Sequence, residues 1–99
     1  MPKDPKKVEQ FKAELVVILI KVASDKKLFN ELLEDLFTPA EYRELATRLQ
    51  IVKELKRGAL QRDVVGKLHT GMATVTRGSR VLLNPKGGFN QILKKYYGL

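Results

Sequence analysis

Lysine and arginine side chains outnumber acidic ones only in the second half of this 99-residue chain, and the resulting positive charge is its most distinctive chemistry. Residues 51–99 hold ten Lys or Arg against only Glu54 and Asp63, whereas residues 1–50 hold nine basic and nine acidic residues. The formal net charge of +8 therefore comes entirely from the second half. Such one-sided positive charge is typical of proteins that bind nucleic acids, and a solvated basic surface without a partner is the alternative.

Residue types that carry catalysis are scarce in this chain. It has no cysteine and one histidine, His69, so it lacks the parts of a thiol nucleophile, a histidine-based zinc site or a serine and histidine pair. No lysine or carboxylate motif suggests another mechanism. We therefore expect neither an enzyme nor a metal protein. The absence of cysteine also fits a reducing cytoplasm.

No stretch of the sequence is long and apolar enough to predict a membrane span. The longest apolar run, Ala13 to Ile20, contains Glu14 and is followed by Lys21, whereas a span needs ~20 residues. No small-residue cleavage site follows the N-terminal lysines, as it would in a secretory signal. We therefore expect a cytoplasmic protein with no membrane partner.

The first part of the sequence predicts two helices. Asp4 followed by Pro5 indicates a helix start, because the carboxylate can accept from free amides and proline suits the first helical position. Residues 15–20 are apolar on every side of this helix, so we expect a partner subunit to enclose it. Ser24 or Asp25 can cap the second helix. Its apolar residues recur at helical spacing: Leu28, Phe29, Leu32, Leu33, Leu36 and Phe37.

A third helix is predicted to start at Thr38, because Thr38 and Glu41 form a capping box that satisfies amides of the first turn. Gly58 can adopt the left-handed conformation that ends it. The expected buried stripe of this helix comprises Leu45, Leu49, Val52 and Leu55.

Residues 61–83 predict two short helices around a tight turn. Val64, Val65 and Leu68 face inward on the first, residues 69–71 interrupt, and Val75 faces inward on the second. This is the outline of a helix-turn-helix, whose second helix enters the major groove of DNA. A loop follows at residues 84–88. The last amphipathic helix carries Phe89, Ile92, Leu93 and Tyr96.

The stretch from residue 36 to residue 82 resembles the tryptophan repressor family. The resemblance is clearest in FTPAEYRELATRLQIVKELKRG, residues 37–58, and in GMATVTRGS, residues 71–79. It implies an all-α subunit of six helices, intertwined with a second copy as a homodimer. It also implies a palindromic operator in double-stranded DNA, with half-sites ~34–36 Å apart.

On this interpretation residues 1–99 form a single domain, with dimerisation helices at about 5–57 and 88–97 and a helix-turn-helix at about 61–83. The positions that match the family's DNA contacts are Gln61, Arg62, Thr70, Gly71, Met72, Ala73, Thr74 and Thr76. Arg80, Lys67 and Lys86 are further candidates for positioning phosphates. Arg62 can present a fork of donors to guanine, although Gln61 and Arg62 as plain exposed surface is the alternative.

The resemblance also implies a corepressor pocket, in which an indole ring lies between the guanidinium planes of Arg48 and Arg77. Arg77 could bind the ligand carboxylate with Thr38 assisting, and Gly78 would leave room beside the ring. L-Tryptophan is the corepressor this implies. Other interpretations stay open, since Thr38 can be a helix cap alone, Arg48 can pair with Glu44, and Gly78 can let helices approach.

Three positions depart from the family pattern. Val81 stands where the family has a serine that helps to hold the ligand's amino group. One residue is missing before Gln61, where the family has a serine able to cap the helix. His69 replaces the glycine of the turn, where a positive φ is needed. Each departure is compatible with a different ligand, or with none.

The predicted function is a sequence-specific DNA-binding transcriptional repressor gated by a small aromatic amino acid. A ligand-independent regulator of the same superfamily is the first alternative. A small basic RNA-binding module is the second, although the aromatic residues of the basic half lie in its last helix and form no base-stacking platform. A structural dimerisation domain is the third alternative. Such a domain would give no DNA-binding signal that changes with salt concentration.

Overall fold

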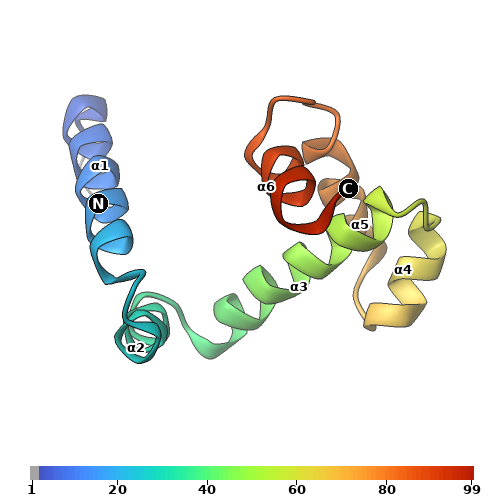
Figure 1. Cartoon of the computed structure of the whole chain (residues 1–99), viewed down its shortest axis with the longest axis horizontal. Helices are drawn as coiled ribbons and strands as arrows, with labels where there is room; N and C mark the ends of the chain where they lie inside the picture. Colours follow the sequence, from blue (N-terminus) through green and yellow to red (C-terminus); the bar gives the residue numbers. More distant parts are fainter. Residues whose placement is uncertain (1–2) are drawn as a thin grey trace. The chain divides into compact units, whose positions relative to one another are not determined.

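The structure is a computed structural model that describes residues 3–99, and these form six helices and no strand (Figure 1). They divide into two compact units, one ending at Pro39 and the other running from Ala40 to Leu99. Within the described residues, no helix has both the length and the hydrophobicity needed to cross a membrane. The predicted all-α chain of six helices is confirmed.

The first unit consists of α1 (Pro5–Val22) and α2 (Lys26–Leu36), which pack against each other. The Asp4 carboxylate caps α1 by accepting a hydrogen bond from the Lys6 amide at 2.9 Å. The Asp25 carboxylate caps α2 by accepting from the Leu28 amide at 3.1 Å. Both predicted helix starts are confirmed, and Asp25 rather than Ser24 provides the second cap.

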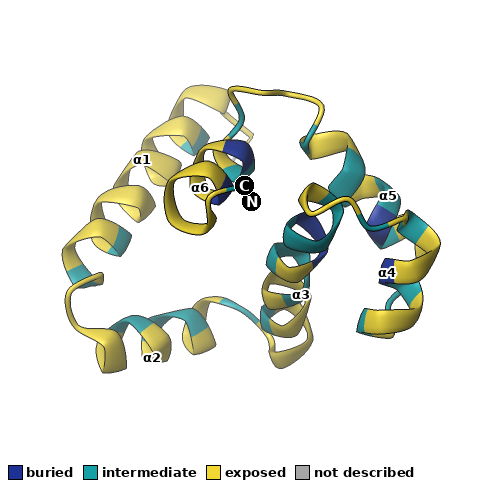
Figure 2. Ribbon diagram, turned by 45° about the vertical axis from the view of Figure 1, so that its right-hand side comes forward, coloured by how far each residue is buried: buried dark blue, intermediate teal, exposed yellow. Residues whose placement is uncertain are grey.

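Neither helix of the first unit contains a buried residue, and Figure 2 shows α1 almost entirely as exposed ribbon. Among its apolar side chains, Ile20 is 70% exposed. The others that lie open on α1 are Phe11, Leu15, Val16, Val17 and Ile18. The predicted apolar helix is therefore present, and α2, the other helix of its unit, does not enclose it.

Four helices build the second unit, although the first of them starts one residue before it. They are α3 (Pro39–Lys56), α4 (Gln61–Leu68), α5 (Met72–Val81) and α6 (Gly88–Tyr97). As predicted, α3 begins directly after Thr38. It ends where Gly58 adopts a φ of 98° and donates from its amide to the Leu55 carbonyl at 3.0 Å. Glycine has no Cβ to oppose a positive φ, so the predicted helix end is confirmed.

The core of the second unit lies where α3, α4 and α5 meet. Ile51, Val64 and Val75 form its fully buried cluster, which confirms Val64 and Val75 as inward-facing residues. Partly buried side chains pack around this cluster: Leu55, Ala59, Val65 and Leu68. Burial of these side chains is the main favourable term that holds α4 and α5 on the end of α3.

The predicted stripe of α3 was partly wrong. Val52 is buried and Leu49 and Leu55 are half-buried, but Leu45 is exposed and the fully buried Ile51 was not predicted. The reason is tertiary. Because α4 and α5 pack near the C-terminal end of α3, the buried face is centred on Ile51 and does not extend back to Leu45.

A buried asparagine ties α6 to the end of α5. Asn90 is 7% exposed, and its Nδ2 donates to the Leu82 carbonyl at 3.0 Å and to the Asn84 carbonyl at 2.8 Å. Leu93 is completely buried, whereas Ile92 and Tyr96, predicted for the same apolar face, are exposed. The face of α6 that packs within this chain is therefore narrower than predicted, and it includes a polar residue.

Candidate DNA interface and ligand cavity

The helix-turn-helix consists of α4, residues 69–71 and α5, and the two helices pack against each other. His69 caps α4 with φ 51° and ψ 48°, in the left-handed region, and its amide donates to the Val65 carbonyl. The prediction that His69 supplies the positive φ of the turn is confirmed, although a side chain makes this conformation less favourable than glycine would. Leu60 precedes α4 without a side-chain cap, as the missing serine implies.

The positions that match the family's DNA contacts, and Arg80, all lie on the helix-turn-helix. The exposed ones are Arg62, Gly71, Met72, Ala73 and Arg80. The half-buried ones are Gln61, Thr70, Thr74 and Thr76. Gly71 is the N-cap of α5, so Met72 and Ala73 occupy its first turn, which is the part of a reading helix that meets base edges. We call α5 the reading helix from here on.

Two of these residues bond to each other across the two helices. The Thr76 hydroxyl on α5 donates to the Gln61 Oε1 on α4 at 3.1 Å, in a half-buried setting. Both side chains were predicted as DNA contacts, each without the other. Their pairing depends on how α4 packs on α5, and no spacing rule along a single helix could have predicted it.

Lys67, predicted to position a phosphate, is engaged within the protein. Its Nζ lies 3.0 Å from the Glu54 Oε2 near the end of α3, and Arg57 Nη1 lies 3.6 Å from the Glu54 Oε1. The hydrogen bond from Lys67 lowers the pKa of Glu54 below its ordinary value of 4.5, with further lowering by the nearby positive charges. Glu54 was missed by sequence reasoning because its partner Lys67 lies on another helix.

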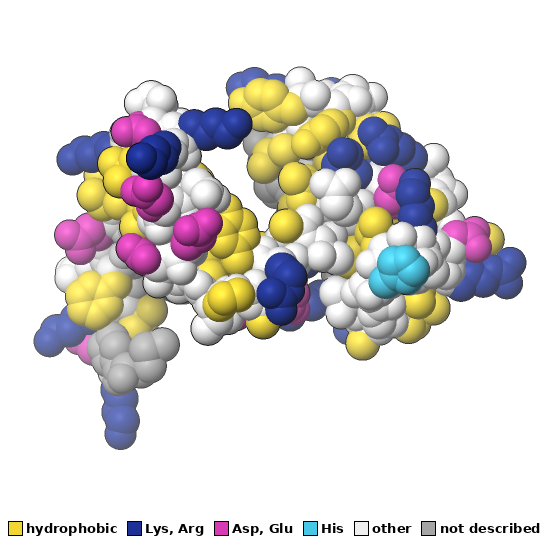
Figure 3. All heavy atoms as spheres, turned by 90° about the horizontal axis from the view of Figure 1, so that it is seen from below, with side chains coloured by type: hydrophobic (Ala, Val, Ile, Leu, Met, Phe, Trp, Pro, Cys, Tyr) yellow, Lys and Arg dark blue, Asp and Glu magenta, His cyan; other side chains and the backbone are white. Residues whose placement is uncertain are grey.

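The remaining candidate, Lys86, is exposed in the loop between α5 and α6. Its backbone amide donates to the Asn84 Oδ1 at 3.0 Å, and this hydrogen bond does not involve the side-chain ammonium group. Figure 3 shows dark-blue basic side chains at the surface, together with the histidine in cyan.

A small cavity joins α3, α5 and α6. It measures about 100 Å³ and is lined by Arg48, Val52, Thr74, Arg77, Gly78, Val81 and Phe89. Arg48, Arg77 and Gly78 were all predicted for the ligand pocket, and Val81 lies in the wall as the departure from the family pattern implied. Thr38 belongs to the first unit and is not part of this lining. Val52 and Phe89 were missed because their sequence signal is that of core residues.

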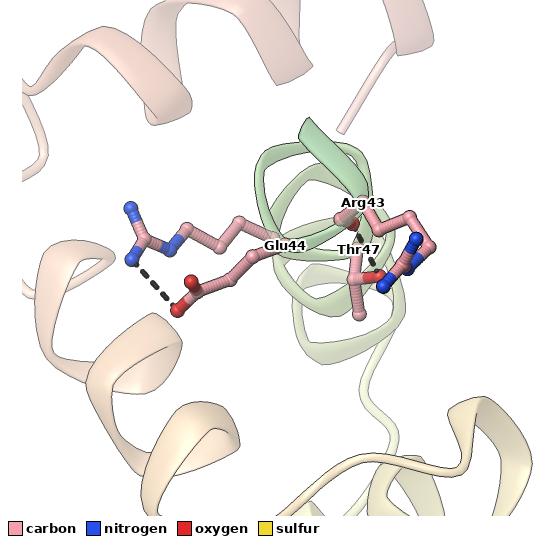
Figure 4. Close-up of polar contacts among 4 residues, drawn as sticks. Arg43, Glu44 and Thr47 are labelled. Atoms are coloured by element: carbon pink, nitrogen blue, oxygen red, sulfur yellow. Dashed lines mark hydrogen bonds and ion pairs between the residues drawn. The ribbon is translucent and has the colours of Figure 1, made fainter. Parts of the chain in front are cut away.

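The Arg48 guanidinium is only partly satisfied by its own helix. Its Nη2 lies 3.0 Å from the Glu44 Oε1, so the predicted pairing with Glu44 is confirmed. Its Nε is buried and has no hydrogen-bond partner among the described residues. Figure 4 shows Glu44 on the side of α3 opposite Arg43 and Thr47, where the Thr47 hydroxyl donates to the Arg43 carbonyl at 2.8 Å. Arg48, which lines the cavity, therefore retains one buried donor.

Gly78 is required for the packing of the reading helix. A Cβ built at this position would lie 2.7 Å from the Ile51 Cγ2, far closer than carbon atoms approach without a shift. The alternative that Gly78 lets two helices approach is thus confirmed, and Gly78 also lines the cavity.

The family model described as Trp repressor protein matches residues 12–97. These residues begin within α1 and end at the last residue of α6. This chain belongs to the Trp repressor family. The match extends well beyond the two motifs at residues 37–58 and 71–79, to both sides of the stretch 36–82 that carries the resemblance.

Several relatives carry the name Trp operon repressor homolog. The one from Vibrio vulnificus (strain YJ016) is 39% identical over 84 residues, which cover 80% of this chain and 82% of the relative. The one from Vibrio cholerae serotype O1 is 43% identical over 68 residues, covering 68% and 66%. The one from Haemophilus influenzae (strain PittEE) is 33% identical over 93 residues, covering 93% and 90%.

Family membership confirms the prediction that this chain is a DNA-binding transcriptional repressor. The family is one of transcriptional repressors and is not an enzyme family.

Proposed function

We propose that the chain represses transcription as an intertwined homodimer on a palindromic operator in the cytoplasm, gated by a small aromatic amino acid. L-Tryptophan is the first candidate for this corepressor. The observation that carries the proposal is the cavity that joins Arg48 of α3 to Arg77 and Gly78 of the reading helix.

The homodimer is supported by the exposed apolar side chains of α1. A helix with large apolar residues on all sides is stable in water only when other elements cover it, and an apolar patch of this kind marks an interaction surface. A two-fold symmetric pair would present two reading helices to DNA. Their separation would match half-sites ~34–36 Å apart on one side of the duplex.

Gating is supported by the position of Arg77 on the reading helix itself. A ligand in the cavity would contact both α3 and α5, so it would stabilise the arrangement of the two helices that it fits best. The two guanidinium groups suit the face of an aromatic ring and a carboxylate. The buried Arg48 Nε is a donor ready for an acceptor on such a ligand.

The cavity is smaller than an indole ring requires. At about 100 Å³ it is smaller than the ~150 Å³ cavity that holds benzene, so an indole ring requires the arginine side chains to move apart. Arg77 is exposed and can do so.

Val81 in the cavity wall favours a second candidate, a repressor of the same family that needs no ligand. Valine cannot hydrogen-bond to an ammonium group, so the site lacks one recognition element for an amino acid. Dependence of operator affinity on the ligand separates the two functions.

Calorimetric titration with L-tryptophan tests the cavity, using Arg77→Ala and Arg62→Ala as a matched pair. Both variants remove one arginine from the helix-turn-helix, but only Arg77 lines the cavity. We expect one ligand per subunit for the wild type and Arg62→Ala, and none for Arg77→Ala. Absence of heat with the wild type over a wide concentration range would remove tryptophan as the corepressor.

Operator affinity is measured in parallel, on a duplex obtained by selection from random sequences. We expect tryptophan to tighten wild-type binding, and Arg62→Ala to weaken it by roughly tenfold or more. Wild-type affinity that is high and unchanged by tryptophan would favour the ligand-independent repressor.

A further inference from the structure

The hydrogen bond between Gln61 and Thr76 fixes which side of the Gln61 amide is available to DNA. A glutamine side chain offers an acceptor oxygen and an NH₂ group with two donors. Here the oxygen accepts from the Thr76 hydroxyl at 3.1 Å, in a half-buried contact between α4 and α5. This hydrogen bond orients the amide so that its oxygen, and not its Nε2, faces the Thr76 hydroxyl.

This orientation limits what Gln61 can recognise. A glutamine that reads adenine uses its oxygen and its nitrogen together, one accepting and one donating. The Gln61 oxygen already accepts one hydrogen bond, from Thr76, and keeps one lone pair, whereas the NH₂ group offers two donors to DNA. Donors match a hydrogen-bond acceptor, and the first helix of a helix-turn-helix crosses the phosphate backbone. Gln61 is the first residue of that helix.

We propose that Thr76 is a positioning residue for Gln61, holding it so that its Nε2 donates to a phosphate oxygen of the DNA duplex. The proposal assigns to Thr76 an action through Gln61 instead of a DNA contact of its own. It rests on the DNA-binding function, and it gives Gln61 no part in reading a base.

A double-mutant cycle on DNA binding tests the coupling. Thr76→Val removes the hydroxyl and keeps the shape of the side chain. We expect Thr76→Val to weaken binding of the selected operator by about three- to tenfold in the wild type, and by less than about twofold in the Gln61→Ala background. Equal effects of Thr76→Val in both backgrounds would overturn the proposal, because they mean that Thr76 acts independently of Gln61.

A scrambled duplex identifies the acceptor. Because phosphates are present at every position, we expect Gln61→Ala to weaken the scrambled duplex by the same factor as the operator. A loss confined to the operator would mean a base contact and would overturn the phosphate assignment. Thr47→Val is the matched control, since the Thr47 hydroxyl donates within α3, to the Arg43 carbonyl. It should leave binding of both duplexes unchanged.

NMR of the DNA-free protein tests the positioning without any DNA-binding readout. We expect the Gln61 side-chain amide to be ordered in the wild type and to become as mobile as an exposed glutamine in Thr76→Val. Gln61→Glu should retain the bond, because a carboxylate still accepts from the Thr76 hydroxyl, while duplex binding falls by about tenfold or more. A wild-type Gln61 amide that is already mobile would overturn the positioning role even if DNA binding itself is established.

Discussion

The two compact units of this chain differ in how they use their apolar residues. In the first unit, α1 and α2 carry many large apolar side chains, yet none of them is buried. In the second unit, a core forms because Ile51, Val64 and Val75 converge from three helices. Helix formation and core formation are therefore separate events in this molecule.

The difference shows what each unit depends on. Isolated helices are marginal in water, and most helical stability comes from packing of an apolar face. The second unit supplies that packing internally, through Gly78 against Ile51 and through the tie from Asn90 to the end of α5. The first unit has capped helix ends but no internal core, so it requires another surface, which we propose is a second copy of the chain.

A charge in the apolar face of α1 provides the strongest test of this comparison. Val17→Asp would change little in an isolated chain, because Val17 is exposed. In the proposed dimer it buries an unpaired carboxylate, which costs several kcal/mol. We therefore expect monomers in analytical ultracentrifugation and loss of operator binding.

The matched control for Val17→Asp is Gln10→Asp, at an exposed polar position of the same helix. It should sediment as the wild type does. If Val17→Asp also sediments like the wild type, the face of α1 that contains Val17 is not the dimer interface.

Truncation at Ile51 tests the core of the second unit. Ile51→Ala leaves a cavity at a fully buried position, so we expect a loss of about 2–5 kcal/mol in the free energy of unfolding. Ile51→Val should lose about 0.5–1.5 kcal/mol. Urea unfolding at one fixed protein concentration measures both, since the stability of a dimer depends on concentration. A loss under ~1 kcal/mol for Ile51→Ala would contradict the central role of this residue.

Two glycines give opposite expectations for the same substitution. Gly78→Ala forces a methyl group against Ile51, whose branched side chain is stiff, and should destabilise the protein by about 1–3 kcal/mol. Gly66→Ala on α4 meets nothing within 4 Å, so its higher helix propensity should stabilise by about 0.5–1 kcal/mol. Thermal unfolding compares the two, and stabilisation by Gly78→Ala would show that the helices do not approach this closely.

The smallest expected effect concerns the ion pair between Glu54 and Lys67. The pKa of Glu54 is lowered in the folded chain, so its contribution is present above the ordinary value of 4.5 and is lost as pH falls through the folded pKa. Wild type and Glu54→Gln should therefore differ in melting temperature at neutral pH and converge in acid.

Removal of the partner provides the control for the Glu54 experiment. In a Lys67→Met background the pH-dependent part of the difference should shrink, because the largest cause of the lowered pKa is absent. If the pH-dependent difference in melting temperature keeps its full size with Lys67→Met, the lowered pKa of Glu54 is due to the other neighbouring charges.

Local signals in the sequence predicted the helices and the turn. Asp4 and Asp25 cap helices because carboxylates accept from free first-turn amides, and Gly58 ends α3 because only glycine adopts a φ of 98° without strain. His69 was predicted to take the positive φ by comparison with the glycine of the family turn. These features depend on residues within a few positions of each other, which is why the sequence alone predicts them.

The candidate site was only partly predictable. Arg48, Arg77 and Gly78 follow from the resemblance, and they do line one cavity. The pairing of Gln61 with Thr76, the engagement of Lys67 by Glu54 and the burial of Asn90 were not foreseen. Each joins residues on different elements, and helical periodicity carries no information about such pairs.

The sequence by itself determined the all-α class, the helix boundaries, the basic second half and membership of the Trp repressor family, because these depend on composition, local backbone preference and motif order. Only the tertiary structure decided that Ile51 and not Leu45 is buried, that Gly78 admits α5 against α3, and which donors remain for DNA or a ligand. The physical reason is that burial and hydrogen-bond pairing depend on the distances between helices, which the order of residues along any one helix does not specify.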